Sequence, residues 1–170
     1  MKIALIALGV LVLVIAVVTV VGYTLPQKHT ASREQTYAAD PAKVFAAITT
    51  PTEYPAWRTG VKRIDVLPDQ DGKRRFREVG SNGTITFVFD EIASGSRVVS
   101  RIADDSLPFG GKWTYELEPS GAGTKLTITE DGEVYNPIFR FMSRFVFGHH
   151  ASLDAFHDDL KRRVESSAGL

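Results

Sequence analysis

The segment FGHHASLDAFHDDL, residues 147–160, places three histidines and three aspartates in fourteen positions. Imidazole and carboxylate groups are the side chains that most often bind metals or transfer protons near neutral pH. Such a cluster can be a metal site, an acid–base site or simply the polar face of a helix. The helical positions of the residues, and the elements around them, distinguish these three possibilities.

On a helix, at about 100° per residue, His150 falls in one group with Asp154, His157, Asp158 and Lys161. His150 and His157 are then about 10.5 Å apart along the helix axis. A zinc ion bound by both histidines would need an imidazole nitrogen of each at about 2.1 Å. The separation along the helix makes such an arrangement strained. Lysine and aspartate three or four positions apart form ordinary charge pairs. We therefore expect a solvated polar face and no metal site.

His149 falls instead in the apolar stripe of the same helix, where residues are spaced by threes and fours. The stripe contains Ile138, Met142, Phe145, His149, Leu153, Phe156, Leu160 and Val164. His149 is either a core histidine bonded to a backbone carbonyl or a polar group facing an apolar cavity, where it orients a ligand or transfers a proton. The sequence reveals no acidic partner for it. His149 is thus the only catalytic candidate, and no catalytic residue is assigned.

This stripe predicts one long helix from Pro137 to about Glu165, 29 residues in all. Its start is marked by Asn136 before the proline, because a capping side chain accepts a free backbone N–H and proline lacks one. Asp40–Pro41 and Thr50–Pro51 repeat this pattern and predict two short helices.

Between Val61 and Gly132 polar and apolar residues alternate, interrupted by turn residues, which predicts six strands. The segment SREQTYAA, residues 32–39, predicts a seventh. Alternation places Ile85, Phe87 and Phe89 on one face of a strand, and Trp113, Tyr115 and Leu117 on one face of another. An antiparallel sheet with one strongly apolar face needs a cover, and the C-terminal helix is the candidate.

The N-terminal segment from Ile3 to Val21 contains nineteen residues without a charge. About 20 apolar residues cross a bilayer core, and the run extends to Leu25. A cleaved signal peptide is the alternative, but its apolar region is usually shorter and ends in a small-x-small site. We expect a single-pass anchor over Ile3 to Leu25 in a bacterial inner membrane. Positive residues flank the segment on both sides, so the positive-inside rule does not determine on which side of the membrane the soluble domain lies.

The expected domain division is therefore an anchor at 1–25, a linker at 26–32, one globular domain at 33–165 and a tail at 166–170. Lys2 is the only charged residue before position 27, so the rest carries 19 basic and 20 acidic residues. This near-neutral balance argues against nucleic acid as a partner. The absence of cysteine excludes disulfides and thiolate chemistry. We expect no cofactor, and the sequence leaves protein partners unknown.

Two segments resemble a known family: DPAKVFAAITTPTEYPAWRTGVKRIDVL, residues 40–67, and NPIFRFMSRFVFGHHASLDAFHDDLKRR, residues 136–163. They are similar to the opening and the closing helix of the START-like SRPBCC superfamily, in its polyketide cyclase/dehydrase subgroup. The resemblance implies an α+β helix-grip fold, in which a curved antiparallel sheet of about seven strands surrounds a long C-terminal helix. It also implies an apolar cavity between sheet and helix.

Members of this superfamily bind lipids, sterols, quinones or polyketides, and some catalyse cyclisation or dehydration. The N-terminal anchor is a departure from the ordinary soluble member of this superfamily. Together, the expected anchor and the resemblance indicate a membrane-tethered module that holds a lipid, isoprenoid or polyketide-like molecule. The alternatives are a cyclase or dehydratase that uses His149 as acid–base, and an interaction protein with a closed core. The candidate cavity residues are Trp57, Phe87, Phe89, Trp113, Tyr115, Met142, Phe145, His149, Leu153 and Phe156.

Overall fold

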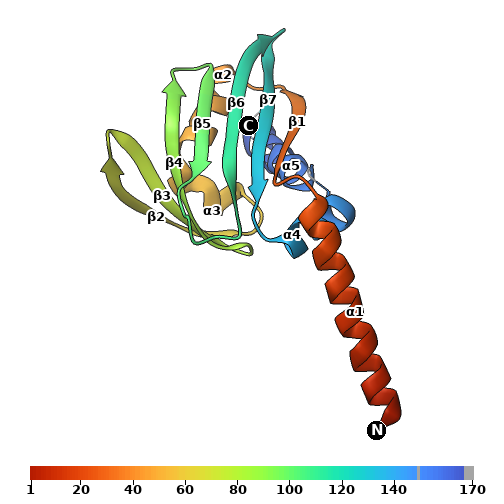
Figure 1. Cartoon of the computed structure of the whole chain (residues 1–170). Helices are drawn as coiled ribbons and strands as arrows, with labels where there is room; N and C mark the ends of the chain where they lie inside the picture. Colours follow the sequence, from red (N-terminus) through yellow and green to blue (C-terminus); the bar gives the residue numbers. More distant parts are fainter. Residues whose placement is uncertain (149, 167–170) are drawn as a thin grey trace.

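The computed structural model describes residues 1–148 and 150–166 (Figure 1). Its strands are β1 (Lys28–Tyr37), β2 (Val61–Gln70), β3 (Lys73–Gly80), β4 (Gly83–Ala93), β5 (Arg97–Ile102), β6 (Phe109–Ser120) and β7 (Gly123–Val134). Its helical elements are α1 (Lys2–Thr24), α2 (Pro41–Thr49), the 3₁₀ turn η1 (Pro51–Glu53), α3 (Tyr54–Trp57), α4 (Pro137–Met142), the π-helical turn η2 (Ser143–Phe147) and α5 (Ala151–Glu165).

Within the described residues, seven strands form one antiparallel sheet in the order β1-β7-β6-β5-β4-β3-β2. This confirms the predicted sheet. Because neighbouring strands are antiparallel, the starts of β2, β4, β6 and β1 lie at the same end of the sheet as the ends of β3, β5 and β7. We call this the proximal end, since α1 leads into β1 there (Figure 1).

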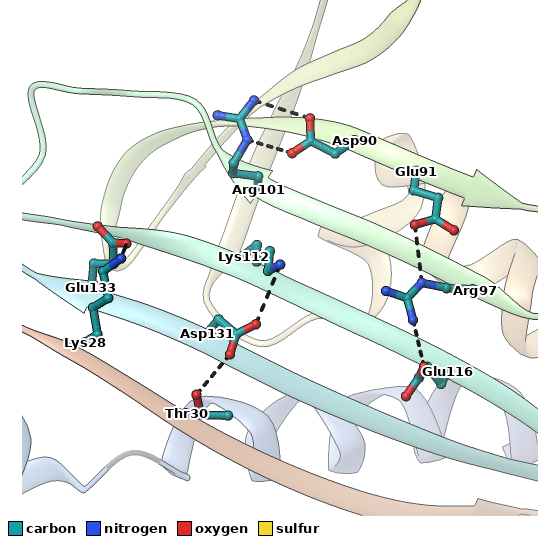
Figure 2. A network of polar contacts seen from close by, with 10 residues as sticks. All are labelled: Lys28, Thr30, Asp90, Glu91, Arg97, Arg101, Lys112, Glu116, Asp131 and Glu133. Carbon is teal, nitrogen blue, oxygen red and sulfur yellow. Dashed lines mark hydrogen bonds and ion pairs between the residues drawn. The ribbon is translucent and has the colours of Figure 1, made fainter.

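One face of the sheet is charged, and its side chains pair across strands (Figure 2). Arg101 on β5 donates to Asp90 on β4, with a shortest distance of 2.6 Å. Arg97 reaches both Glu91 and Glu116, at 3.3 and 2.8 Å. Such exposed pairs contribute little stability individually, but they keep this face polar. The helices therefore cover the opposite face.

The core lies between that opposite face and helices α2, α3 and α5. Residues predicted to face inward do so: Phe89 and Leu117 are buried in the core, and Leu153 of α5 is fully buried against it. Their burial removes apolar surface from water and holds α5 on the sheet.

The prediction of one helix over residues 137–165 is wrong, because the chain is interrupted between η2 and α5. Gly148 has φ +74° and ψ 171°, a conformation favoured by glycine and incompatible with a continuing helix. A C-terminal helix is present, but it is α5 alone, Ala151–Glu165. Residue 149, and with it the prediction for His149, lies outside the described residues.

Strand β1 also differs from expectation, since it starts at Lys28 and takes up most of the segment predicted as a linker at 26–32. The backbone of these residues pairs with β7, from Lys28 opposite Glu133 to Ser32 opposite Thr129. Pairing with a neighbour thus orders a polar segment that has no apolar alternation of its own. Of the predicted tail at 166–170, residues 167–170 lie outside the described residues.

Helix α1 is long and apolar enough to cross a membrane, although a signal sequence has the same properties. Its C-terminal end is held by Arg140 of α4. This buried guanidinium donates to the backbone carbonyls of Gly22 and Leu25, at 3.2 and 3.1 Å, and to that of Tyr135 at 2.9 Å. A cation at a helix C-terminus also complements the helix dipole. Gly22 is itself buried, and a Cβ built there would lie 1.9 Å from the carbonyl oxygen of Pro137.

Candidate functional site: a cavity under the sheet

The inner face of the sheet, α3, the α4–η2 segment and α5 line a partly open cavity of about 420 Å³. This size is within the range of pockets that hold small organic ligands. The cavity is thus not closed by the protein's own side chains. Its wall has an aromatic part, a paired charged part and a second polar part, which come from different elements.

The aromatic part of the wall is formed by Phe76, Phe87, Trp113, Tyr115 and Phe156. The rings contact one another: the centroids of Phe76 and Phe87 are 5.4 Å apart in a stacked arrangement, and the ring of Phe156 packs edge-on against Trp113 at 5.8 Å. Aromatic pairs of this geometry are rigid and apolar. Burial raises the pKa of Tyr115, so its hydroxyl stays protonated at neutral pH. This part of the wall suits an apolar or aromatic ligand.

Arg58 and Glu78 supply the charged part of the wall, and they form a salt bridge of 2.6 Å. The guanidinium also lies over two aromatic rings, 4.9 Å from the centroid of Tyr54 and 5.3 Å from that of Phe156. These cation–π contacts hold Arg58 in place. The two charges neutralise each other, so this part of the wall is polar without a net charge.

Asp159 of α5 also lines the cavity and is buried. Its carboxylate accepts hydrogen bonds from the Thr59 backbone N–H at 2.5 Å and from the Thr59 hydroxyl at 2.8 Å, and it pairs with Arg162. The carboxylate therefore fastens the end of α3 to α5. Buried carboxylates with several donors are typically structural anchors.

His29 and Glu130 form the second polar part, with 3.4 Å between His29 Nε2 and the Glu130 carboxylate. Ser152 of α5 donates to the same carboxylate at 3.2 Å. The side chains of His29 and Glu130 are largely buried, at 16% and 20% exposure. Gly132, opposite His29 in the register, makes room for the imidazole, because a Cβ there would lie 2.3 Å from His29 Cε1.

This histidine–glutamate pair was not predicted, because His29 lies in the segment expected to be a linker. The signal was present in the sequence as the glycine at position 132 within a strand pattern. An isolated glycine in a strand often marks a close approach by another group. The identity of the approaching group depends on the pairing of β1 with β7, which one sequence does not provide.

The predicted cavity residues are distributed over several places. Four of them line the cavity: Phe87, Trp113, Tyr115 and Phe156. Three pack in or against the core without lining it: Trp57, Phe89 and Leu153. Met142 is partly buried in α4, Phe145 is 59% exposed, and His149 lies outside the described residues.

The residues predicted to form a polar face on α5 differ in their exposure to solvent. Asp154 is exposed and pairs with Arg33 at 2.7 Å, as expected for a solvated face. His157, predicted on that face, is buried instead. Its Nδ1 accepts from the Tyr37 hydroxyl at 2.5 Å, and its Nε2–H donates to the Arg33 carbonyl at 3.3 Å. Strand β1 covers this side of α5, which explains the difference.

Burial lowers the pKa of His157, so the ring is neutral at pH 7 in this position. Among residues 1–148 and 150–166, no group of three or more histidine, aspartate or glutamate residues is arranged to hold a metal ion. The site is thus described by its aromatic wall, the Arg58–Glu78 pair and the His29–Glu130 pair.

A curved antiparallel sheet that packs on a C-terminal helix, with a cavity between them, defines a START-like fold. The chain belongs to the family described as polyketide cyclase/dehydrase and lipid transport, whose family model matches residues 28–165. This confirms the resemblance noted in the sequence. A search of curated proteins finds no match to the sequence.

Solved structures with the same fold share little sequence with this chain. A START superfamily protein from Mycobacterium smegmatis has 18% identity and a TM-score of 0.66, covering 82% of this chain and 99% of that one. The aromatase/cyclase Zhui from Streptomyces sp. R1128 has 14% identity and a TM-score of 0.62, covering 84% and 99%. A truncated norcoclaurine synthase from Thalictrum flavum has 11% identity and a TM-score of 0.64, covering 81% and 94%. Identities this low establish the fold alone.

Proposed function

We propose that this protein is a membrane-tethered module that holds a hydrophobic small molecule, such as a lipid, isoprenoid or polyketide-like compound, in the cavity under its sheet. The observation that carries the proposal is the aromatic wall of a cavity of about 420 Å³. If this region were only a hydrophobic core, we would expect side chains to fill the space, since close packing stabilises a protein interior.

The tether in this proposal is α1, retained as a single-pass anchor. The Arg140 contacts support retention. Removal of residues 1–25 would leave the buried guanidinium without the carbonyls of Gly22 and Leu25. A buried charge that loses its hydrogen-bond partners destabilises the folded state. We therefore expect the intact chain in the membrane pellet after an alkaline wash. Recovery of a soluble chain that starts near Tyr23 would contradict the tether.

The cavity size sets the expected affinity. An apolar ligand that buries about 300 Å² of apolar surface gains roughly 7 kcal/mol at about 25 cal/mol per Å². Lost translational and rotational freedom reduces this gain. The result corresponds to micromolar binding at best, which suits a carrier that also releases its ligand.

Ser100 offers the sharpest test of the cavity. Its small side chain lines the cavity between the aromatic residues Phe89 and Trp113 of the neighbouring strands. A Ser100→Phe substitution should place a ring in the ligand's volume. Ser96→Phe puts the same ring on the exposed turn before β5 and serves as the control.

The assay titrates the full chain in lipid nanodiscs with N-phenyl-1-naphthylamine, an apolar probe that accepts excitation energy from Trp113. Empty nanodiscs give the background for probe dissolved in lipid. We expect saturable energy transfer for the parent and Ser96→Phe, and at least tenfold weaker binding for Ser100→Phe with unchanged thermal unfolding. Equal binding by both variants, or none by the parent, would contradict the proposal. If the parent binds the probe as expected, mass spectrometry of compounds that co-purify with it would identify the natural ligand.

A second candidate function is a cyclase or dehydratase, and the His29–Glu130 pair favours it. A histidine beside a carboxylate in an apolar cavity is a common acid–base arrangement. Similarity to an aromatase/cyclase makes a poly-β-keto thioester a reasonable test substrate. In this case His29→Gln should retain probe binding but lose turnover. A parent protein that binds the thioester and leaves it unchanged would exclude this function for that substrate.

A further inference from the structure

The cavity lies at the proximal end of the sheet, where α1 joins the domain. Its lining includes Ile102 at the end of β5, Phe109 at the start of β6 and Val134 at the end of β7. Asn82, in the turn between β3 and β4, lines it as well. All four belong to the proximal end defined by the antiparallel register. These lining residues therefore lie at the end of the sheet where α1 joins the domain, and Figure 1 shows that end of the sheet.

The α4–η2 segment lies at this end and is unusually apolar on its outside. Four of its side chains are exposed: Ile138 by 40%, Phe139 by 53%, Phe145 by 59% and Val146 by 58%. We call these four the α4–η2 apolar surface. Exposed apolar side chains that gather in one short segment of a soluble domain usually mark a binding surface.

This surface continues directly from α1. The Arg140 bonds to Gly22 and Leu25, and the close approach of Gly22 to Pro137, fix α4 against the last turn of α1. Figure 1 shows α4 beside that end of α1. If α1 crosses a bilayer, the last turn of the helix lies at the membrane surface. The α4–η2 apolar surface is then held at the same depth.

The surface also touches the cavity. Phe139 is half exposed and lines the cavity, and so do Ser143 of η2 and the exposed Gly148 after it. Arg144 is exposed within the same segment. A long basic side chain at a membrane surface reaches the phosphate groups while its stem stays in apolar surroundings. The segment thus has the composition of an interfacial membrane element.

We propose that the α4–η2 apolar surface is embedded in the interfacial zone of the bilayer that α1 spans, so that the cavity opens to the membrane. This inference rests on the proposed membrane anchor, and it specifies the route by which the ligand reaches the cavity. The hydrophobic molecule exchanges between bilayer and cavity beside Phe139 and does not pass through bulk water. The partner of this surface is the lipid bilayer.

The chain has no cysteine, so single cysteines can carry a nitroxide label without background. The test compares Phe145→Cys with Val66→Cys in full-length protein in liposomes. Val66 is an equally apolar control on β2, 69% exposed against 59% for Phe145. Oxygen is concentrated in lipid and enhances the spin relaxation of nitroxide labels there, whereas a water-soluble nickel chelate enhances the relaxation of labels exposed to water. We expect a severalfold higher oxygen-to-nickel ratio at position 145 than at 66. Equal ratios would overturn the proposal.

A kinetic measurement tests the opening. With N-phenyl-1-naphthylamine preloaded in donor liposomes, a Phe145→Ser variant, which changes the α4–η2 apolar surface outside the cavity lining, should fill the cavity about tenfold more slowly, with unchanged occupancy at equilibrium. An unchanged rate would overturn membrane loading. Efficient disulfide cross-linking between Phe145→Cys copies at high lipid-to-protein ratio would also overturn it, by assigning the surface to a second copy.

The two proposals fail in different ways. If α1 is not in the membrane, an alkaline wash releases the chain and the label at position 145 is exposed to nickel. If the cavity holds no ligand, the label still reports lipid, but the parent shows no saturable binding of the probe. A lipid-exposed label with normal binding and unchanged loading would overturn only the route proposed here.

Discussion

Replacement of Arg140 by methionine tests how firmly α1 is joined to the domain. The side chain keeps a similar length and apolar stem but loses its hydrogen bonds. Two of the three bonds cross to α1, at the carbonyls of Gly22 and Leu25. A hydrogen bond from a charged donor contributes about 1.5–3 kcal/mol. The loss of two should therefore lower the free energy of detaching α1 by about 3 kcal/mol.

The readout is cleavage after Lys28 by an endoproteinase specific for lysine, in full-length protein in nanodiscs. Lys28 is the first residue of β1, directly after the junction. Proteolysis that requires local opening follows the population of the open state. A change of about 3 kcal/mol should raise the cleavage rate about 100-fold, since each 1.4 kcal/mol is a factor of ten. The product is recognised by its new N-terminus, His29.

Arg144→Met is the matched control, because Arg144 is exposed and lies one turn further along the same segment. The protease does not cut at arginine, so neither substitution removes a cleavage site. We expect the control to be cleaved at the parental rate. Cleavage of Arg140→Met at the rate of the control would refute the reasoning, and α1 would then be a flexible tether.

Three further outcomes follow from single contacts. Gly22→Ala should accelerate the same cleavage, since its Cβ would lie 1.9 Å from a backbone oxygen of α4, whereas Gly9→Ala, with nothing within 4 Å, should not. Burial holds the pKa of His157 below its ordinary 6.5, so the unfolded chain takes up the proton first as pH falls. Stability should be full above about pH 6.5 and decrease below it by up to about 1.4 kcal/mol per pH unit, and His157→Phe should remove this slope in urea unfolding. Asp159→Asn should cost about 2 kcal/mol in the same measurement, whereas Asp158→Asn on the exposed side should change stability by less than about 0.5 kcal/mol.

The sheet and two helix starts could be predicted because their signals are local. Alternation along a strand reports which face is buried, whichever strand is its neighbour. The caps are equally local: the Asp40 carboxylate accepts from the Ala42 N–H at 2.7 Å, and the Asn136 side chain from that of Ile138 at 2.9 Å. These features depend on a few consecutive residues only.

The candidate site was predicted less well because it depends on pairing between distant segments. His29 meets Glu130 only through the register of β1 on β7. His157 is buried because Tyr37 and the Arg33 backbone satisfy both of its ring nitrogens. A helical wheel places such a residue on a polar face, because it takes into account only residue type and position and not the segments that pack against the helix. The aromatic residues Phe87 and Trp113 were found because strand alternation alone directs them inward.

The break at Gly148 connects the largest error of prediction with the proposed function. Spacing by threes and fours continues from Met142 through Phe145 to Leu153, so the pattern predicts one stripe over the sheet. A continuous helix would carry Phe145 onto the apolar face, next to the cavity. At Gly148 the chain instead changes direction, with φ +74°. Leu153 stays in the core while Phe145 remains exposed on η2. The same interruption therefore separates the buried apolar face of α5 from the exposed apolar side chains of α4 and η2.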